Sequence, residues 1–273
     1  MAVDFDRAVA FVREHGDEFD RARLDLLLGD GTLMSHEQEQ RFLIGQRSDG
    51  GWPPFWAPEY SSLDATCYRL SQGEGLQMGF SHPAFARAAD FLRSRQRSDG
   101  CWEEDDAVRK VAPLWARPGE HAPRLYLTAN CGWWLANATQ GGTFVTTDEA
   151  AKRAGAYLER HLAQDGKFPS FLHTHWLAAG LWIRLSRDGL SRSVLDYLVT
   201  RMSSEVPSSS LAWMLTTLGG LGISPDHPLG QKATTLLVAQ QRADGSWASE
   251  DGPDRDPSVT VEALRGLLQW AAL

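Results

Sequence analysis

The side chains that could do acid–base or metal chemistry fall into three small groups. One is Asp64, in the segment Leu63-Asp64-Ala65-Thr66. The second is the acidic run Glu103-Glu104-Asp105-Asp106, whose carboxylates could hold Mg²⁺ or could face water as a charged loop. The third is the pair His173 and His175, which could exchange protons near neutral pH. On a helix these two rings point to nearly opposite sides and do not easily share one metal ion.

The three cysteines are a sparse, odd-numbered set: Cys67, Cys101 and Cys131. A disulfide framework is therefore not expected, and a reducing cytoplasm fits this usage. Together with Asp64 and the histidines, Cys67 and Cys131 could form a zinc site. The alternative is that these cysteines are simply small buried residues.

Composition excludes several classes of function. Hydrophobic residues make up 42% and charged residues 23% of the chain, which is ordinary for a globular protein. The net charge of −8 argues against a nucleic-acid partner, because phosphates attract a basic face. No uncharged apolar run approaches the roughly 18 residues of a membrane span, although peripheral membrane contact stays open. The segment 1–14 carries charges throughout and has no signal-peptide core. We therefore expect a cytoplasmic protein.

A repeat organises the sequence. The motif Gln-Arg-x-Asp-Gly-x-Trp occurs three times, beginning at Gln46, Gln96 and Gln241. The second copy begins 50 residues after the first, and the third 145 residues after the second, which is about three periods of 48. Two degenerate copies are expected between them, one at 164–168 (Gln-Asp-Gly-Lys-Phe) and one near 203–206 that has lost the motif.

Each motif follows an amphipathic helix, and its Asp-Gly pair ends that helix. A more apolar helix follows each loop. These inner helices are marked by hydroxyl residues about 48 positions apart: Thr66, Thr128, Thr174, Ser210 and Thr260. With an N-terminal pair of helices at 5–14 and 18–28, the pattern predicts an all-α protein, a single α/α toroid of about six helical hairpins. We expect one domain over residues 1–273, with an inserted loop at about 103–123 of the kind that forms lids.

The Gln-x-x-x-Gly-x-Trp element resembles the QW repeat of squalene–hopene and oxidosqualene cyclases, shared in weaker form with protein prenyltransferase β-subunits. The resemblance covers residues from about Ser35 to Leu273. In that family the glutamine caps a neighbouring helix end and the tryptophan stacks nearby. The resemblance therefore implies that the Gln and Trp of the three copies hold the scaffold together.

The same resemblance implies an isoprenoid-handling enzyme, a terpenoid cyclase or isomerase that protonates a hydrophobic substrate in an aromatic-lined cavity. Asp64 would be the proton donor, although the family's Asp-x-Asp-Asp is reduced here to one Asp, and capping of its helix is the alternative role. His173 and His175 would be its acid–base partners. The expected substrate-binding residues lie near the starts of the inner helices: Tyr68, Tyr126, Asn130, Trp134, Trp176, Trp213 and Glu262.

No metal or other cofactor is required by this interpretation, although Mg²⁺ at the acidic run or zinc at the Cys/His set stays open. Two other functions are compatible with the sequence. One is a zinc-dependent enzyme of the prenyltransferase-like toroid type, a family that uses an Asp-x-Cys pair and a later histidine. The other is a non-catalytic toroid that binds a lipid or a partner protein.

Overall fold

The computed structural model describes residues 3–138 and 148–271. These residues form twelve α-helices and two 3-10 helices, with no strand in the described ranges beyond one isolated bridge between Trp52 and Ser62. The predicted all-α class is confirmed. The chain forms two compact units, one of residues 36–197 and one of residues 1–35 together with 198–273. Closure of all the hairpins into one ring stays a prediction.

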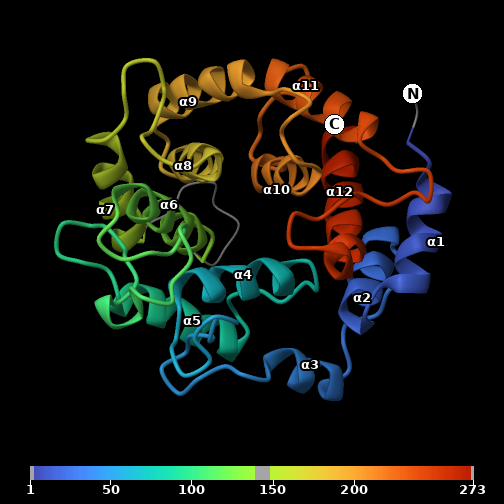
Figure 1. Cartoon of the computed structure of the whole chain (residues 1–273), viewed down its shortest axis with the longest axis horizontal. Coiled ribbons are helices and arrows are strands. Elements are labelled where there is room, and N and C mark those ends of the chain that lie inside the picture. The colour runs from blue at the N-terminus through green and yellow to red at the C-terminus, as the bar shows by residue number, and fades with distance from the viewer. Residues whose placement is uncertain (1–2, 139–147, 272–273) are drawn as a thin grey trace. The chain divides into compact units, whose positions relative to one another are not determined.

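In the unit of residues 36–197, whose helices are labelled in Figure 1, strongly amphipathic helices alternate along the chain with weakly amphipathic ones. Its amphipathic helices are α3 (His36–Leu43), α5 (Pro83–Ser94) and α7 (Glu149–Glu159). Its inner helices are α4 (Leu63–Glu74), α6 (His121–Asn137) and α8 (Leu172–Arg184). Helix α6 packs against α4, α5, α7 and α8. Nearly all residues of α6 from Leu125 onward are buried, as expected of a helix that is apolar on most sides. Helix α9 (Asp188–Arg201) contains the boundary between the two units.

The second unit combines the two ends of the chain. It contains α1 (Phe5–His15), α2 (Glu18–Leu28), α10 (Ser208–Leu218), α11 (Pro228–Ala239) and α12 (Asp256–Ala271). Helix α12 packs on α10 and also on α1 and α2. Asp17 begins α2 with a capping box that it forms with Asp20. The N-terminal pair of helices is thus present as the sequence indicates.

The motif glutamine joins each hairpin to the next amphipathic helix. Gln46 Nε2 donates to the carbonyl of Gly50 in its own turn at 3.0 Å and to Ala84 in α5 at 2.7 Å. Gln96 repeats the pattern with Ala150 in α7. Gln241 makes the same bond to Asp4, the residue that caps α1. The contact that links successive hairpins therefore also links the last hairpin to the first helix.

The motif tryptophan is held by a threonine of the following inner helix. The backbone N–H of Trp102 donates to Thr128 Oγ1 at 3.0 Å, and that hydroxyl in turn donates to a carbonyl one turn back in α6. The same bond joins the other two motif tryptophans to Thr66 and Thr260. All three indoles are at most 2% exposed. The residue that accepts this bond is an internal reference position in each of these three repeats, and we call it the anchor residue.

The degenerate copy at 164–168 keeps the turn in a different register from the one the sequence indicates. Ala163 N–H donates to Lys167 C=O, as Arg47 does to Gly51, so Leu162 occupies the glutamine position and Gln164 does not. Phe168 replaces the tryptophan, and its N–H donates to His175 Nε2 at 3.0 Å. The anchor of this repeat is therefore His175 and not Thr174.

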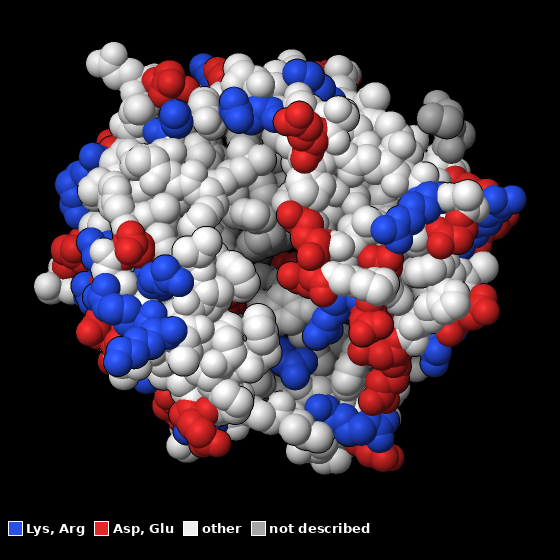
Figure 2. All heavy atoms as spheres, in the orientation of Figure 1, with Lys and Arg blue, Asp and Glu red and all other residues white. Residues whose placement is uncertain are grey.

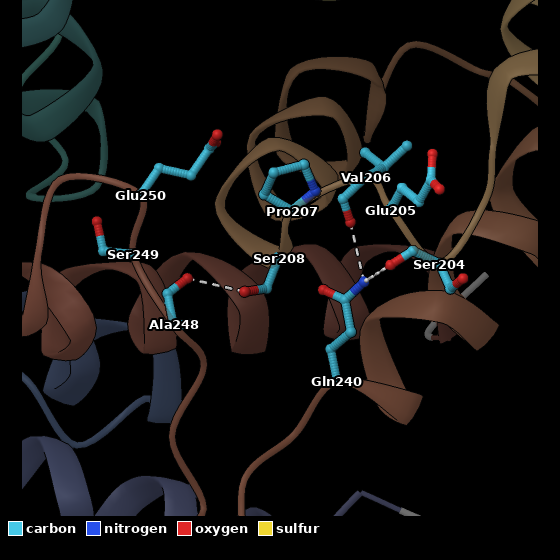
Figure 3. A pocket seen from close by; sticks show the side chains of 9 residues that line it. All are labelled: Ser204, Glu205, Val206, Pro207, Ser208, Gln240, Ala248, Ser249 and Glu250. Carbon is cyan, nitrogen blue, oxygen red and sulfur yellow. Dashed lines mark hydrogen bonds between the residues drawn. The ribbon is translucent and has the colours of Figure 1, made fainter.

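The copy expected near 203–206 keeps a turn without the motif. Val206 N–H donates to Ser203 C=O, as Gly50 does to Arg47, and α10 begins only two residues after Val206. Gln240, at the end of α11, donates to the Val206 carbonyl at 2.9 Å and so joins this turn to the following hairpin (Figure 3). A cavity of about 310 Å³ lies between this turn and residues 248–250.

Candidate active site

The anchor register determines which inner-helix side chains share a face. Residues two before and two after an anchor are one helical turn apart and lie on the same side of the helix. Applied to the four anchors, this rule selects four pairs: Asp64 and Tyr68, Tyr126 and Asn130, His173 and Leu177, and Ser258 and Glu262. The first three pairs belong to the unit of residues 36–197.

Asp64 is the centre of a hydrogen-bonded group in that unit. Tyr126 Oη donates to Asp64 Oδ1 at 2.8 Å, and Trp115 Nε1 donates to Oδ2 at 3.0 Å. The N-cap of α4 is Ser62, which accepts from the N–H of Ala65. The carboxylate of Asp64 is therefore directed to α6 and to the inserted loop, and capping of its own helix is not its role.

A chain of hydrogen bonds extends from Asp64 into α6. Asn130 Nδ2 donates to Tyr126 Oη at 3.3 Å. Asn130 is 2% exposed, and its Oδ1 has no hydrogen-bond partner among the described residues. Burial and the negative charge of Asp64 hold the pKa of Tyr126 well above its usual range, so the phenol keeps its proton. A buried carbonyl oxygen without a donor is costly, and this one belongs to a side chain that is hydrogen-bonded to the Tyr126 phenol.

His173 adds a neutral imidazole beside this chain. Its ring lies 4.7 Å from Trp176 and 6.3 Å from Tyr126, measured between ring centroids. Phe171 packs edge-on against Tyr126. Burial lowers the pKa of His173 to about 4, so the ring is uncharged at neutral pH and can accept a proton.

His175 is placed differently. Its Nε2 accepts from the Phe168 N–H, which puts the ring proton on Nδ1, 3.1 Å from the Phe171 carbonyl. The ring also stacks on Tyr197. Because both ring nitrogens are engaged by the backbone, His175 serves the scaffold.

The acidic run divides into two buried and two exposed residues. Glu103 binds Arg97, Arg124 and the N–H of Gly119, and so fixes the end of the inserted loop. Glu104 accepts from Ser62 Oγ at 2.6 Å, from Tyr60 Oη at 2.9 Å, and from two backbone N–H groups of α4. Both carboxylates are thus engaged by protein donors.

The other two acids of the run are exposed. Asp105 caps the 3-10 helix η1 (Asp106–Val108), and Asp106 pairs with Arg109. The expectation of a solvated acidic loop therefore fits only Asp105 and Asp106.

The cysteines that could have bound zinc lie together but without further ligands. Cys67 Sγ and Cys131 Sγ are 3.9 Å apart and fully buried, and burial raises the pKa of both thiols. In the described ranges, no three His, Cys, Asp or Glu side chains are grouped as a metal-ligand set. Two adjacent buried thiols of this kind are typical of packing.

The remaining predicted site residues are more scattered. Tyr68 is 49% exposed and its hydroxyl accepts from Gln72, whereas Trp134 is buried within α6. Trp213 and Glu262 belong to the other unit. There Glu262 accepts from Arg23 at 2.5 Å, beside Ser258, which accepts from the same guanidinium. Nothing in the amphipathic pattern of α2 marks Arg23 as a buried partner.

Surface charge and helix length indicate which kinds of partner the protein could contact. Acidic side chains lie among the basic ones on the face drawn in Figure 2, in keeping with exposed pairs such as Arg187–Glu159 and Arg93–Asp90. Among the described residues, no helix has the length and apolar character needed to cross a membrane.

Comparison with known proteins identifies the fold. No family of known sequences matches the chain, and no curated protein matches it in sequence. Among solved structures, the type II terpene cyclase MstE from Scytonema superposes with a TM-score of 0.64 at 15% identity, covering 98% of this chain and 97% of the other. A protein from Actinoplanes superposes with a TM-score of 0.63 at 16% identity, covering 97% and 98%. The all-α fold is thus similar over its whole length to that of a terpene cyclase.

Proposed function

We propose that this protein is an isoprenoid-handling enzyme of the terpene cyclase or isomerase type, with Asp64 as its proton donor. The proposal draws on the whole-length likeness of its fold to a type II terpene cyclase. The observation that carries it is the chain from Asp64 through Tyr126 to Asn130, which ends at a buried oxygen that has no donor among the described residues.

This chain can run in either direction, and the two directions correspond to two protonation states of Asp64. With the Asn130 amide nitrogen toward Tyr126, the bonds run from Asn130 to Tyr126 to Asp64, which suits a carboxylate. If the amide turns over, its oxygen accepts from Tyr126, and Tyr126 can accept from a protonated Asp64. The second direction also gives the Asn130 oxygen a donor. The site can therefore hold Asp64 as a neutral acid, the form that proton donation requires.

The reaction would consist of balanced proton transfers. The Asp64 carboxyl gives its proton to an alkene or epoxide of the substrate, which leaves a carboxylate on Asp64 and a cationic centre on the substrate. The face of a neighbouring aromatic ring, such as Tyr126, would stabilise such a cation by roughly 0.5–2 kcal/mol. Loss of a substrate proton to neutral His173 ends the reaction, and exchange with solvent restores both groups.

The zinc-dependent alternative lacks a ligand set in the described part of the chain, and we do not propose it. A non-catalytic lipid-binding role is the second candidate. It is favoured by one observation, the rings of Phe171 and His173 beside Tyr126, which suit a hydrophobic ligand whether or not it reacts.

The two candidates are separated by product analysis. The purified protein is incubated with C10 to C30 prenyl alcohols, diphosphates and epoxides, and the products are identified by mass spectrometry. We expect a cyclised or isomerised product that is lost in Asp64→Asn and retained in the surface control Asp106→Asn. Saturable binding of a prenyl compound without any product would favour the lipid-binding role, and turnover by Asp64→Asn equal to the wild type would remove Asp64 from the reaction.

A further inference from the structure

A second carboxylate, that of Glu104, binds the backbone N–H of Asp64. Glu104 is 1% exposed and stands at the amino end of α4. Its Oε1 accepts from the Asp64 N–H and its Oε2 from the Leu63 N–H, each at 3.2 Å. Ser62 Oγ and Tyr60 Oη complete the set of donors. Glu104 therefore holds the backbone of the residue that we propose as the proton donor.

The groups that face Glu104 are almost all acidic or neutral. From α4 they are Asp64 and Cys67, and from α6 they are Cys131 and, through Asp64, Tyr126. From the loop before α4 comes Tyr60, whose pKa is raised by burial and by the charge of Glu104. Arg95, at the end of α5, acts on Tyr60 and lowers its pKa only slightly. No ion pair with Glu104 occurs among the described residues, in contrast to Glu103 with its two arginines.

Four donors favour the ionised form of Glu104, whereas burial opposes it. The balance raises the pKa of Glu104 to about 7, with burial as the largest cause. The carboxylate therefore gains and loses its charge in the neutral range. Loss of that charge weakens the bonds to the first turn of α4 and removes a negative charge from the vicinity of Asp64.

We propose that Glu104 is the positioning residue of the Asp64 site: its ionised carboxylate fixes the first turn of α4, and its charge favours retention of a proton by Asp64. The inference makes the site pH dependent and rests on the proposed function only for its consequence in catalysis. The proposed role of Glu104 rests on the four hydrogen bonds that converge on its buried carboxylate.

The test follows the Asp64 carboxyl carbon by NMR in protein labelled with ¹³C at aspartate side chains, with Asp64→Asn to assign the resonance. We expect the wild-type Asp64 signal to show a step near pH 7, where Glu104 titrates. In Glu104→Gln that step disappears. In Tyr60→Phe, which removes one donor to the ionised form, the step moves to higher pH. Asp106→Asn, an exposed carboxylate of the same loop, leaves the step in place.

Two results overturn the proposal: an unchanged Asp64 curve in Glu104→Gln, or a step in Tyr60→Phe that stays or moves to lower pH. If Glu104→Gln does not fold, Tyr60→Phe decides. The readout needs no substrate, so a coupled titration in a protein that turns over no isoprenoid would contradict the proposed function and leave this inference standing. If turnover occurs, the acid limb of the wild-type kcat profile, set by protonation of Glu104, shifts with Tyr60→Phe.

Discussion

The buried Glu104 carboxyl gives a prediction for the pH dependence of stability. Its pKa rises from 4.5 to about 7 on folding because burial penalises the charged form. Between these values the folded protein binds a proton that the unfolded chain has released. The free energy of unfolding therefore falls as pH rises from about 4.5 through 7. The full shift is worth roughly 3 kcal/mol.

His173 acts in the opposite sense and has to be separated. Burial lowers its pKa from 6.5 to about 4, so its contribution to stability is lost as pH falls through that window. Between about pH 4.5 and 6.5 the two effects oppose each other. Together, these two groups therefore leave the free energy of unfolding of the wild type nearly constant in that range. A variant that lacks one of these two groups shows the pH dependence of stability that the other one causes. Glu104→Gln loses stability toward acid, whereas His173→Gln gains it.

The measurement is urea unfolding of the wild type and both variants at pH 5 and pH 8. From pH 5 to pH 8 we expect the stability of the wild type to change little and that of Glu104→Gln to increase, and the two changes to differ by roughly 2–3 kcal/mol. Asp106→Asn serves as the control and parallels the wild type. Profiles of wild type and Glu104→Gln that run parallel within about 0.5 kcal/mol would refute the assignment of the titrating group.

Three further predictions test the scaffold. Thr128→Val leaves the buried Trp102 N–H without an acceptor and is expected to cost about 1–3 kcal/mol in urea unfolding, whereas Thr234→Val, whose hydroxyl bonds only within α11, costs under about 1 kcal/mol; equal costs would contradict the anchor role. Gly100→Ala places a Cβ 2.7 Å from the Arg153 carbonyl at a φ of 96°, so we expect a loss of about 1–3 kcal/mol, against little change for Gly189→Ala, which meets no atom within 4 Å. Cys67 and Cys131 are fully buried and should resist a thiol reagent at pH 8 until the protein unfolds, and rapid labelling of the native protein would show that α4 and α6 open.

Local patterns in the sequence were sufficient to predict the all-α fold class. The spacing of the apolar residues and the Asp-Gly turns were sufficient to place the hairpins, because helix periodicity and left-handed glycine turns are local properties. Gly50, Gly100 and Gly245 all adopt the positive φ that the motif requires. The register of the degenerate copy at 164–168 was not predictable, because a histidine replaced the threonine anchor and Gln164 lay near the position of a lost glutamine.

The site was predictable in part. Asp64, Tyr126 and Asn130 could be named because they lie near the starts of the inner helices, whereas His173 and His175 could be told apart only once the structure showed that His175 is the anchor. The roles of Glu104 and Trp115 depend on the path of the inserted loop, which has no repeat counterpart. The Arg23–Glu262 pair joins α2 to α12 across more than two hundred positions of sequence, and no local pattern reports such a contact.

The role of Asp64 as a proton donor is decided by comparing product formation from isoprenoids by the wild type and by Asp64→Asn. Equal amounts of the two proteins are incubated with the C10 to C30 panel, and products are quantified by mass spectrometry with Asp106→Asn in parallel. We expect a cyclised or isomerised product from the wild type and from Asp106→Asn, and a loss of at least about 100-fold in Asp64→Asn, since a positioned general acid contributes about 10²–10⁴-fold. A product formed at the wild-type rate by Asp64→Asn, or no product from any member of the panel, would contradict it.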